Sequence, residues 1–268
     1  MKPIFALFLL LTNFSLLQSQ NPDSSKNVRI NDFSASIGLS DFHIRDERAS
    51  PLTFRGQGIM FNVSYGRTGE NHKHLLDFLI NTDMLNSDFG EYYSFGIRGY
   101  ARYNYYYRVV NSNRRDNRFN IFIGGGLSTF LNCSFFFEKS YPEQVSNNLA
   151  NTWYFVHSIE ISVLMDYKYK GKNIFELRLF QPLVSNISRP PYSIAWSTPN
   201  STGLFNLIGN NSFFWEYSNI QLKLMYQRLI NEWLNLSFDY YFQYSSYPQP
   251  RQLNFYSNYF LAGAHLKF

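Results

Sequence analysis

The stretch that decides the fold is residues 93–105, which read YSFGIRGYARYNY. Its apolar and aromatic side chains recur at every second position, at Tyr93, Phe95, Ile97, Gly99, Ala101, Tyr103 and Tyr105. The intervening positions are Ser94, Gly96, Arg98, Tyr100, Arg102 and Asn104. Successive side chains of a β-strand point to opposite faces, so a period of two predicts a strand with one apolar and one polar face.

The same period recurs along the rest of the chain. It is found in segments 33–40, 59–66, 76–81, 119–129, 159–168, 175–180, 220–227, 234–243 and 260–268. Most of these segments have room for the roughly 9–11 residues that a tilted membrane strand needs. We therefore predict an all-β fold, a transmembrane antiparallel up-and-down β-barrel of about ten strands.

The connections between these segments alternate in length. Short turns are expected at 66–73, 109–118, 170–173 and 229–232, and longer loops at 45–53, 85–91, 137–151, 185–212 and 245–253. Outer-membrane barrels have short periplasmic turns and longer extracellular loops. The pattern predicts that the short turns face the periplasm and the loops face outward.

Composition excludes several other classes of protein. Of the 268 residues 19% are aromatic and 16% are charged, and the formal net charge is only +5. A disordered chain would need few apolar residues and many charges, and a nucleic-acid binder would show a basic block. The single cysteine, Cys133, and the absence of a zinc-like spacing of Cys or His predict no disulfide, no metal site and no cofactor.

The N-terminus has the layout of a secretory signal peptide. Lys2 supplies a positive start, residues 4–17 are mostly apolar, and Ser19 offers a small residue for cleavage. We expect residues 1–19 to be a cleaved signal peptide, 20–29 a periplasmic leader and 30–268 the barrel. An uncleaved anchor helix is the alternative for the first segment.

A soluble, secreted β-sandwich or lipocalin-like barrel would show a similar alternation, with its apolar face turned inward. Three features favour the membrane: strand length, the signal peptide, and aromatic residues at strand ends. The aromatic clusters are 105–107 and 153–155, where an interfacial girdle would place them.

The final segment, 259–268, reads YFLAGAHLKF and ends on an aromatic residue, Phe268. With the signal peptide and the amphipathic strands, the whole mature chain resembles a bacterial outer-membrane β-barrel protein. The resemblance implies a multi-pass barrel in the Gram-negative outer membrane, surrounded by lipid. It also implies that Phe268 is an assembly signal, and that periplasmic chaperones and the barrel assembly machinery are partners during biogenesis.

If the apolar face meets lipid, the polar face lines the lumen, and its charged residues nearly balance. We expect an ion-pair network of Asp77, Arg98, Arg102, Glu160, Asp166, Glu176, Arg178, Lys223 and Asp239. Specifically, Arg98 or Arg102 should pair with Glu160 or Asp239, because a buried charge must be paired. Barrels of about eight strands have interiors filled by side chains. The inward Tyr100, Phe122, Phe130, Phe180 and Tyr241 would fill this one further, and a narrow polar path for ions is the alternative.

Candidate catalytic residues do not form a convincing site. His43 lies near three acids at an outer rim, and Asp83 and Asp88 flank an outer loop in a way that resembles ten-stranded surface proteases. His157 and Ser158 are adjacent, so on a strand they point to opposite faces. The triplet Gly124 to Gly126 lacks the Lys and helix of a phosphate loop. We predict that the chain is not an enzyme.

The long loop 185–212 is the best candidate for binding a partner. The residues proposed to bind are Arg189, Tyr192 and Trp196, with Phe213, Phe214 and Trp215 directly after the loop. Long loops without secondary structure are usually functional or disordered, and aromatic residues can anchor a partner. The alternatives are an aromatic rim resting on the membrane, or a loop that plugs the barrel.

The sequence therefore predicts a non-catalytic outer-membrane protein that acts as a scaffold, a surface-binding protein or a subunit of an envelope complex. Another envelope protein is a candidate partner, and nucleic acid is not. The first alternative is a narrow pore or transport component, and the second is a surface hydrolase located at the rim.

Overall fold

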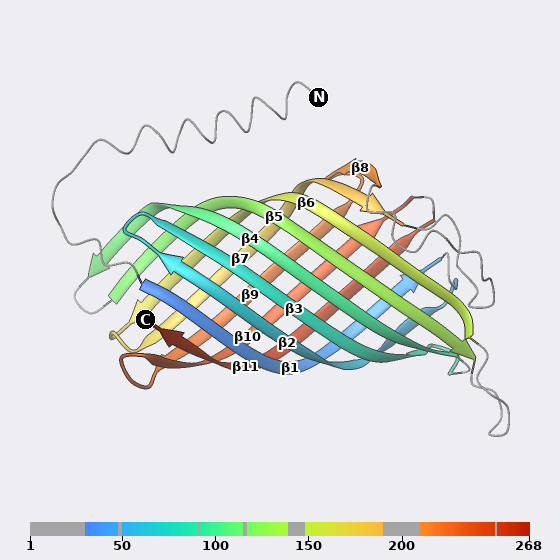
Figure 1. Ribbon diagram of the computed structural model, residues 1–268, viewed down its shortest axis with the longest axis horizontal. Helices are drawn as coiled ribbons and strands as arrows, with labels where there is room; N and C mark the ends of the chain where they lie inside the picture. The colour runs from blue at the N-terminus through green and yellow to red at the C-terminus, as the bar shows by residue number, and fades with distance from the viewer. Residues whose placement is uncertain are drawn as a thin grey trace.

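The computed structural model describes residues 30–47, 50–90, 92–114, 117–138, 148–189, 209–249 and 251–268 (Figure 1). The predicted signal peptide and leader lie outside these residues. The described part forms one antiparallel sheet. Its strands are β1 (Ile30–Asp46), β2 (Thr53–Thr68), β3 (His72–Ser87), β4 (Tyr92–Arg114), β5 (Asn117–Glu138), β6 (Asn148–Tyr169), β7 (Asn173–Ser188), β8 (Asn210–Phe213), β9 (Ser218–Leu229), β10 (Leu234–Tyr247) and β11 (Leu253–Lys267).

The sheet closes on itself as a barrel of ten wall strands. Each wall strand pairs with the next along the chain, and β1 pairs with β11 over fifteen residues, from Asp32↔Lys267 to Asp46↔Leu253. The short β8 pairs with one end of β7, while β9 pairs with the remainder. β8 is thus an addition to the wall, and the predicted up-and-down barrel is confirmed.

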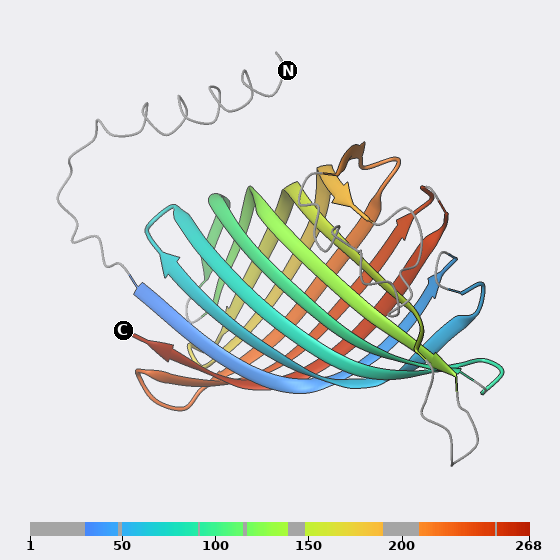
Figure 2. The same cartoon turned by 45° about the vertical axis from the view of Figure 1, so that its right-hand side comes forward.

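The two ends of the barrel differ. We call the end that holds the β2–β3, β4–β5, β6–β7 and β9–β10 connections the turn end; it also holds Ile30 and Phe268, and lies at the left of Figures 1 and 2. The opposite end, with the longer connections, is the loop end. In the β6–β7 turn Lys170 and Gly171 both have positive φ, 49° and 68°. This is the backbone of a type I′ hairpin turn, which matches the twist of the flanking strands.

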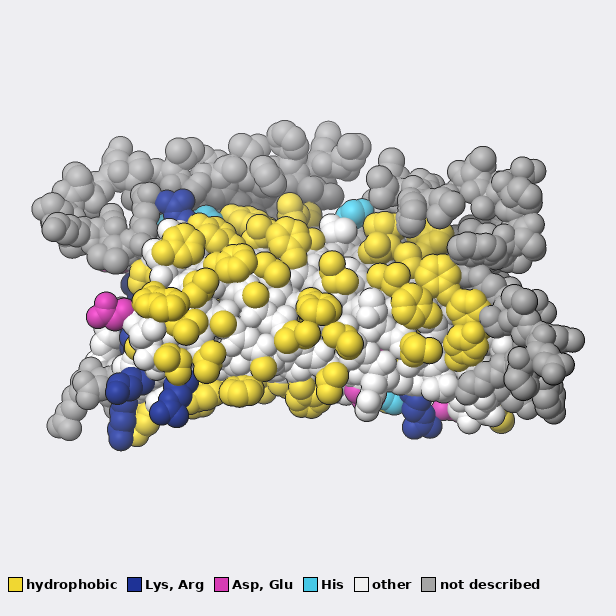
Figure 3. All heavy atoms as spheres, turned by 60° about the horizontal axis from the view of Figure 1, so that its bottom comes forward, with side chains coloured by type: hydrophobic (Ala, Val, Ile, Leu, Met, Phe, Trp, Pro, Cys, Tyr) yellow, Lys and Arg dark blue, Asp and Glu magenta, His cyan; other side chains and the backbone are white. Residues whose placement is uncertain are grey.

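The distribution of side chains is inverted relative to a soluble barrel. Apolar residues cover the outer wall (Figure 3), and many are more than half exposed, among them Ile37, Leu39, Phe61, Ile80, Leu127, Phe238 and Phe260. Soluble monomers rarely expose an apolar surface of this extent. The inward positions carry buried polar and charged side chains instead. A lipid bilayer is the environment that this wall fits. No helix among the described residues is long and apolar enough to cross a membrane.

Several predicted connections are shorter than the sequence indicated. The expected turn 109–118 is mostly strand, because β4 runs to Arg114 and β5 starts at Asn117, with a register shift between Arg108 and Val110. The expected loop 185–212 contains the end of β7 and all of β8 except its last residue, Phe213. Both extensions carry polar residues on both faces, so hydrogen bonding continues where the apolar alternation has stopped.

The triplet Gly124 to Gly126 lies inside β5, where the backbones of neighbouring strands approach closely. A Cβ atom on Gly126 would lie 1.9 Å from the carbonyl oxygen of Tyr103. The triplet therefore serves strand packing, as expected for glycine within a strand.

Candidate functional site

The middle of the lumen is held by an ion pair between β4 and β6. Arg102 Nε lies 2.7 Å from Glu160 Oε1, and the two side chains are 4% and 0% exposed. This is one of the pairs that the sequence predicts. The Arg102 guanidinium also stacks over the ring of Phe180, 3.5 Å from its centroid, and donates to the Tyr100 hydroxyl at 2.6 Å. Arg102 therefore has a partner on several sides.

Arg98 lies four residues before Arg102 on β4, on the same inward face and closer to the loop end. It does not pair with Glu160 or Asp239, the two acids that were expected. Its partner is Asp83 on β3, and both side chains are buried. The guanidinium lies over the ring of Phe42, 3.2 Å from its centroid. Asp83 was expected at the outer rim beside Asp88, and that expectation is wrong. β3 continues to Ser87, which keeps Asp83 on the inward face.

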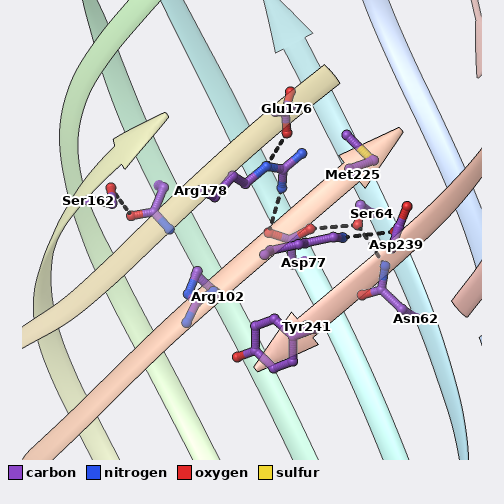
Figure 4. A network of polar contacts seen from close by, with 12 residues as sticks. Asn62, Ser64, Asp77, Arg102, Ser162, Glu176, Arg178, Met225, Asp239 and Tyr241 are labelled. Carbon is purple, nitrogen blue, oxygen red and sulfur yellow. Dashed lines mark hydrogen bonds and ion pairs between the residues drawn. The ribbon is translucent and has the colours of Figure 1, made fainter. Parts of the chain in front are cut away.

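A larger polar cluster lies toward the turn end (Figure 4). Arg178 contacts Glu176 on its own strand and Asp77 on β3, the latter at 3.4 Å. Ser64 donates to Asp77 at 2.5 Å, and Lys73 Nζ lies 2.9 Å from Glu176. These five residues, Ser64, Lys73, Asp77, Glu176 and Arg178, connect β2, β3 and β7 across the interior, and we call them the Arg178 cluster.

Two more acids of the predicted network lie nearby. Asp239 on β10 forms an ion pair with Lys223 on β9 at 3.4 Å, and Asp166 accepts a hydrogen bond from the amide of Asn120 at 2.5 Å. Lys73 was missed in the sequence because it was assigned to a turn. The signal that could have found it is its spacing, since Lys73 shares the inward face with Leu75 and Asp77.

The lumen at the loop end contains a cluster of aromatic rings, which the sequence did not predict. Phe42, Phe130, Tyr154 and Phe255 stack on one another with ring centroids 5.4–6.1 Å apart, and we call these four residues the loop-end plug. Their exposed fractions are 0–3%, so solvent does not reach them. Phe42, Tyr154 and Phe255 lie outside the segments in which alternation was recognised.

The residues proposed to bind a partner fall into three groups. Tyr192 and Trp196 lie outside the described residues. Arg189 is drawn into the barrel mouth, where it pairs with Asp46 of β1 and donates to the carbonyl of Arg251 at 2.9 Å. Thr152 of β6 also donates to Asp46, at 3.1 Å. Arg189 thus joins the end of β7 to β1 and to the β10–β11 connection.

The third group forms an exposed aromatic tip, which we define as Phe213, Phe214 and Trp215. It lies where the chain passes from β8 to β9, and its side chains are 45%, 50% and 67% exposed. Trp215 stacks on Phe213 and meets Phe214 edge-on, with centroids 4.8 Å apart in both cases. The Phe213 amide donates to Glu216 at 3.2 Å, which fixes the turn.

The histidines do not assemble a site at the rim. His43 pairs with Asp41 at 3.4 Å but faces outward, stacked on Tyr256 at 4.2 Å. Asp88 pairs with Arg55, also outside. His157, which faces outward, contacts Thr129. Within the described residues no group of His, Cys, Asp and Glu could hold a metal ion.

The expected assembly signal, Phe268, ends the final strand at the turn end. Its amide donates to the carbonyl of Asn31 at 3.0 Å, and its ring is 71% exposed.

Comparison with known proteins gives the fold. No family model matches the chain, and no curated protein matches it. The outer-membrane protease OmpT from Escherichia coli is similar in structure, with a TM-score of 0.51 and 9% identity over 93% of this chain and 100% of that one. The translocator domain of the autotransporter NalP from Neisseria meningitidis gives a TM-score of 0.43 at 10% identity, covering 98% and 96%. The fold is that of bacterial outer-membrane β-barrels.

Proposed function

We propose that this chain is a non-catalytic outer-membrane scaffold that presents its loop end to another envelope protein. The observation that supports the proposal best is the filled lumen. The loop-end plug, the Arg102–Glu160 pair and the Arg178 cluster follow one another along the axis, and their members are buried. A barrel filled in this way offers rigidity, because Arg102 and Arg178 each pair with an acid on another strand.

The loop end supplies the surface that a partner would contact. The aromatic tip exposes three large rings next to each other, and aromatic residues are enriched where proteins bind one another. Arg189 ties the start of the adjacent connection to Asp46, so the base of this surface is fixed to the wall. A fixed base lowers the entropy that binding would cost.

Affinity purification of the tagged protein from native outer membranes in mild detergent tests the proposal. One variant replaces residues 190–208 with a short Gly-Ser linker and keeps Arg189, so that its pair with Asp46 survives. A second variant changes Phe213, Phe214 and Trp215 to Ser. The matched control is Phe89→Ser, because Phe89 is a 75% exposed aromatic residue on another loop.

We expect a stoichiometric partner with the unchanged protein and with Phe89→Ser, and its loss in at least one of the other variants. Heat-modifiable mobility in gels confirms that each variant is folded. The absence of a stoichiometric partner, or its retention by both loop-end variants, would contradict the proposal. Planar-bilayer recording tests the alternative of a pore, because a filled barrel should carry no steady current.

A further inference from the structure

A cavity of about 210 Å³ opens into the lumen at the turn end. Its wall includes six cationic side chains and only three acidic ones. The cations are Lys73, Arg108, Arg118, Lys168, Arg178 and Lys267, and the acids are Asp32, Asp166 and Glu176. We call this cavity the turn-end vestibule. Figure 3 shows that Lys and Arg gather at the same end of the molecule.

Part of this positive charge is neutralised within the barrel. Glu176 is shared by Lys73 and Arg178, with Asp77 as a second partner of Arg178. Asp32 lies 3.3 Å from His265. These contacts use two of the three acids that line the vestibule. Asp166 remains, and it accepts a hydrogen bond from the neutral amide of Asn120.

Four of the cations are in no ion pair with another described residue: Arg108, Arg118, Lys168 and Lys267. Arg108 donates to the amide oxygen of Asn71 instead, at 2.8 Å. Arg118 and Lys168 lie directly opposite each other on β5 and β6. Like charges in such a cross-strand pair repel and destabilise the sheet. The described neighbours of Arg118 offer its Nε the amide oxygen of Asn120 at 3.3 Å, which carries no charge. Asp166, which faces Asn120 on the same inward face of β6, is the acid of the vestibule nearest to this pair. Two cations therefore share one carboxylate, and a bound anion would balance the remaining positive charge.

The shape of the vestibule indicates what kind of anion fits. A water molecule needs about 10–15 Å³ of such space, so the cavity holds on the order of ten. That is enough for one oxyanion with part of its hydration shell. Glu176 and Arg178, drawn in Figure 4, form part of its wall, so the vestibule is a polar cup that borders the Arg178 cluster.

We propose that the turn-end vestibule binds a phosphate-type oxyanion, with Arg118, Lys168 and Lys267 as its ligands. The planar guanidinium of Arg118 can donate two parallel hydrogen bonds to such a group, and the two ammonium groups supply point charges. The ligand is soluble, because the barrel wall separates these inward side chains from the lipid. If the short turns face the periplasm, it is a periplasmic phosphate or a small phosphorylated molecule.

Calorimetric titration of the full-length protein in uncharged detergent tests the site. Inorganic phosphate is the probe, and ionic strength is held constant with chloride, because salt screens exposed charges. The test variant combines Arg118→Gln, Lys168→Gln and Lys267→Gln. The control variant combines Lys170→Gln and Lys172→Gln, two lysines of the β6–β7 turn that do not line the vestibule. It lowers the net charge of the same end and leaves the cup intact.

The site predicts saturable binding of one phosphate per chain by the unchanged protein and by the control. The triple variant should bind at least about tenfold more weakly, since each hydrogen bond to a charged group contributes that much or more. Heat-modifiable gel mobility establishes that the triple variant is folded. If that variant does not fold, Lys168→Gln alone replaces it, with the same direction expected.

The urea midpoint is a second measurement. It distinguishes phosphate binding from the loss of repulsion among the cations that the triple variant removes. Phosphate should raise the urea midpoint of the unchanged protein and leave that of the triple variant unmoved, because only a ligand that binds the folded state stabilises it. Two results would overturn the proposal: no saturable heat with the unchanged protein, or an equal loss of affinity in the control and the triple variant.

Discussion

The buried pair of Arg102 and Glu160 gives a quantitative test of the packed lumen. Glu160→Gln keeps the shape of the side chain and its hydrogen bond with Asn104, but removes the charge that Arg102 faces. Breaking a buried ion pair by removing one partner costs about 3–5 kcal/mol, because the other charge is left uncompensated. The two side chains are 4% and 0% exposed, so solvent cannot make up the loss.

The double variant Glu160→Gln with Arg102→Met separates this cost from ordinary packing. Methionine keeps an apolar side chain over the ring of Phe180 and leaves no charge at either position of this pair. Its remaining cost is the hydrogen bonds to Tyr100 and Gln221 and the cation–π contact, about 2–4 kcal/mol together. The double variant should therefore be more stable than Glu160→Gln alone, with a coupling free energy of at least about 2 kcal/mol.

Urea unfolding of the protein reconstituted in phospholipid vesicles, followed by fluorescence of its four tryptophans, measures these differences. With a slope of about 2 kcal/mol per molar urea, Glu160→Gln should lower the midpoint by about 2 M. The exposed pair of Arg55 and Asp88 is the control, and its coupling should stay below about 1 kcal/mol. If the effects of Glu160→Gln and Arg102→Met simply add, the two charges do not depend on each other, and the interpretation of the lumen is refuted.

Three further perturbations probe other parts of the barrel. Leu39→Arg places a charge on the lipid-facing wall and should destabilise the vesicle-bound protein by about 2–4 kcal/mol in urea titration if the residue lies near the bilayer midplane; no change would mean that this wall is not in lipid. Phe130→Ala removes a ring from the loop-end plug and should cost about 3–5 kcal/mol by the same assay; a cost below about 1 kcal/mol would show that the plug is not packed. Trp215→Ser should leave the urea midpoint within about 0.5 kcal/mol of the unchanged protein, since the aromatic tip is exposed; a large loss of stability would make the tip part of the core.

The architecture could be predicted from the sequence because the alternation of apolar and polar residues in each strand shows which face meets lipid. Alternation around Ile97 and Arg98 assigns the two faces without knowledge of any other strand. Ten alternating segments and the lengths of their connections are enough to predict an up-and-down barrel, because strands that are neighbours in sequence are also neighbours in space there. The inward positions of Arg102, Glu160 and Arg178 follow from the same rule.

The partners of these side chains could not be predicted in the same way. A contact across the lumen depends on how far each strand is staggered when the barrel closes, and one strand's pattern does not contain that stagger. Arg98 does not reach Glu160 or Asp239 and meets Asp83 on the adjacent strand β3, where Asp83 lies opposite Gly96. Arg189 meets Asp46, although 143 residues separate them along the chain. The contact between Arg189 and Asp46 becomes visible only once the barrel has closed.

The positions at which the strands end were predicted wrongly for a different reason. Outside the hydrocarbon region a strand needs no apolar face, and its backbone can still pair. The polar stretch from Asn111 to Asn113 reads as a turn, yet it pairs with residues 118–120 of β5. For the same reason Lys73 was placed in a turn and Asp83 beside an outer loop, although both face the lumen. Charged residues that continue the inward register beyond an apolar segment are the signal to look for.

The lumen has two barriers in series, which leads to a prediction about conductance. The loop-end plug excludes water with aromatic rings, and Arg102–Glu160 closes the middle of the barrel with a compact ion pair. Removing Phe130 and Tyr154 side chains opens only the first barrier, so Phe130→Ala with Tyr154→Ala should remain non-conducting in planar bilayers. Adding Arg102→Ala and Glu160→Ala should produce a steady current, because both barriers are then lined by small side chains. If the first variant already conducts, the ion pair does not close the lumen. If the fourfold variant is folded by gel mobility and still carries no current, a third barrier must lie in the Arg178 cluster.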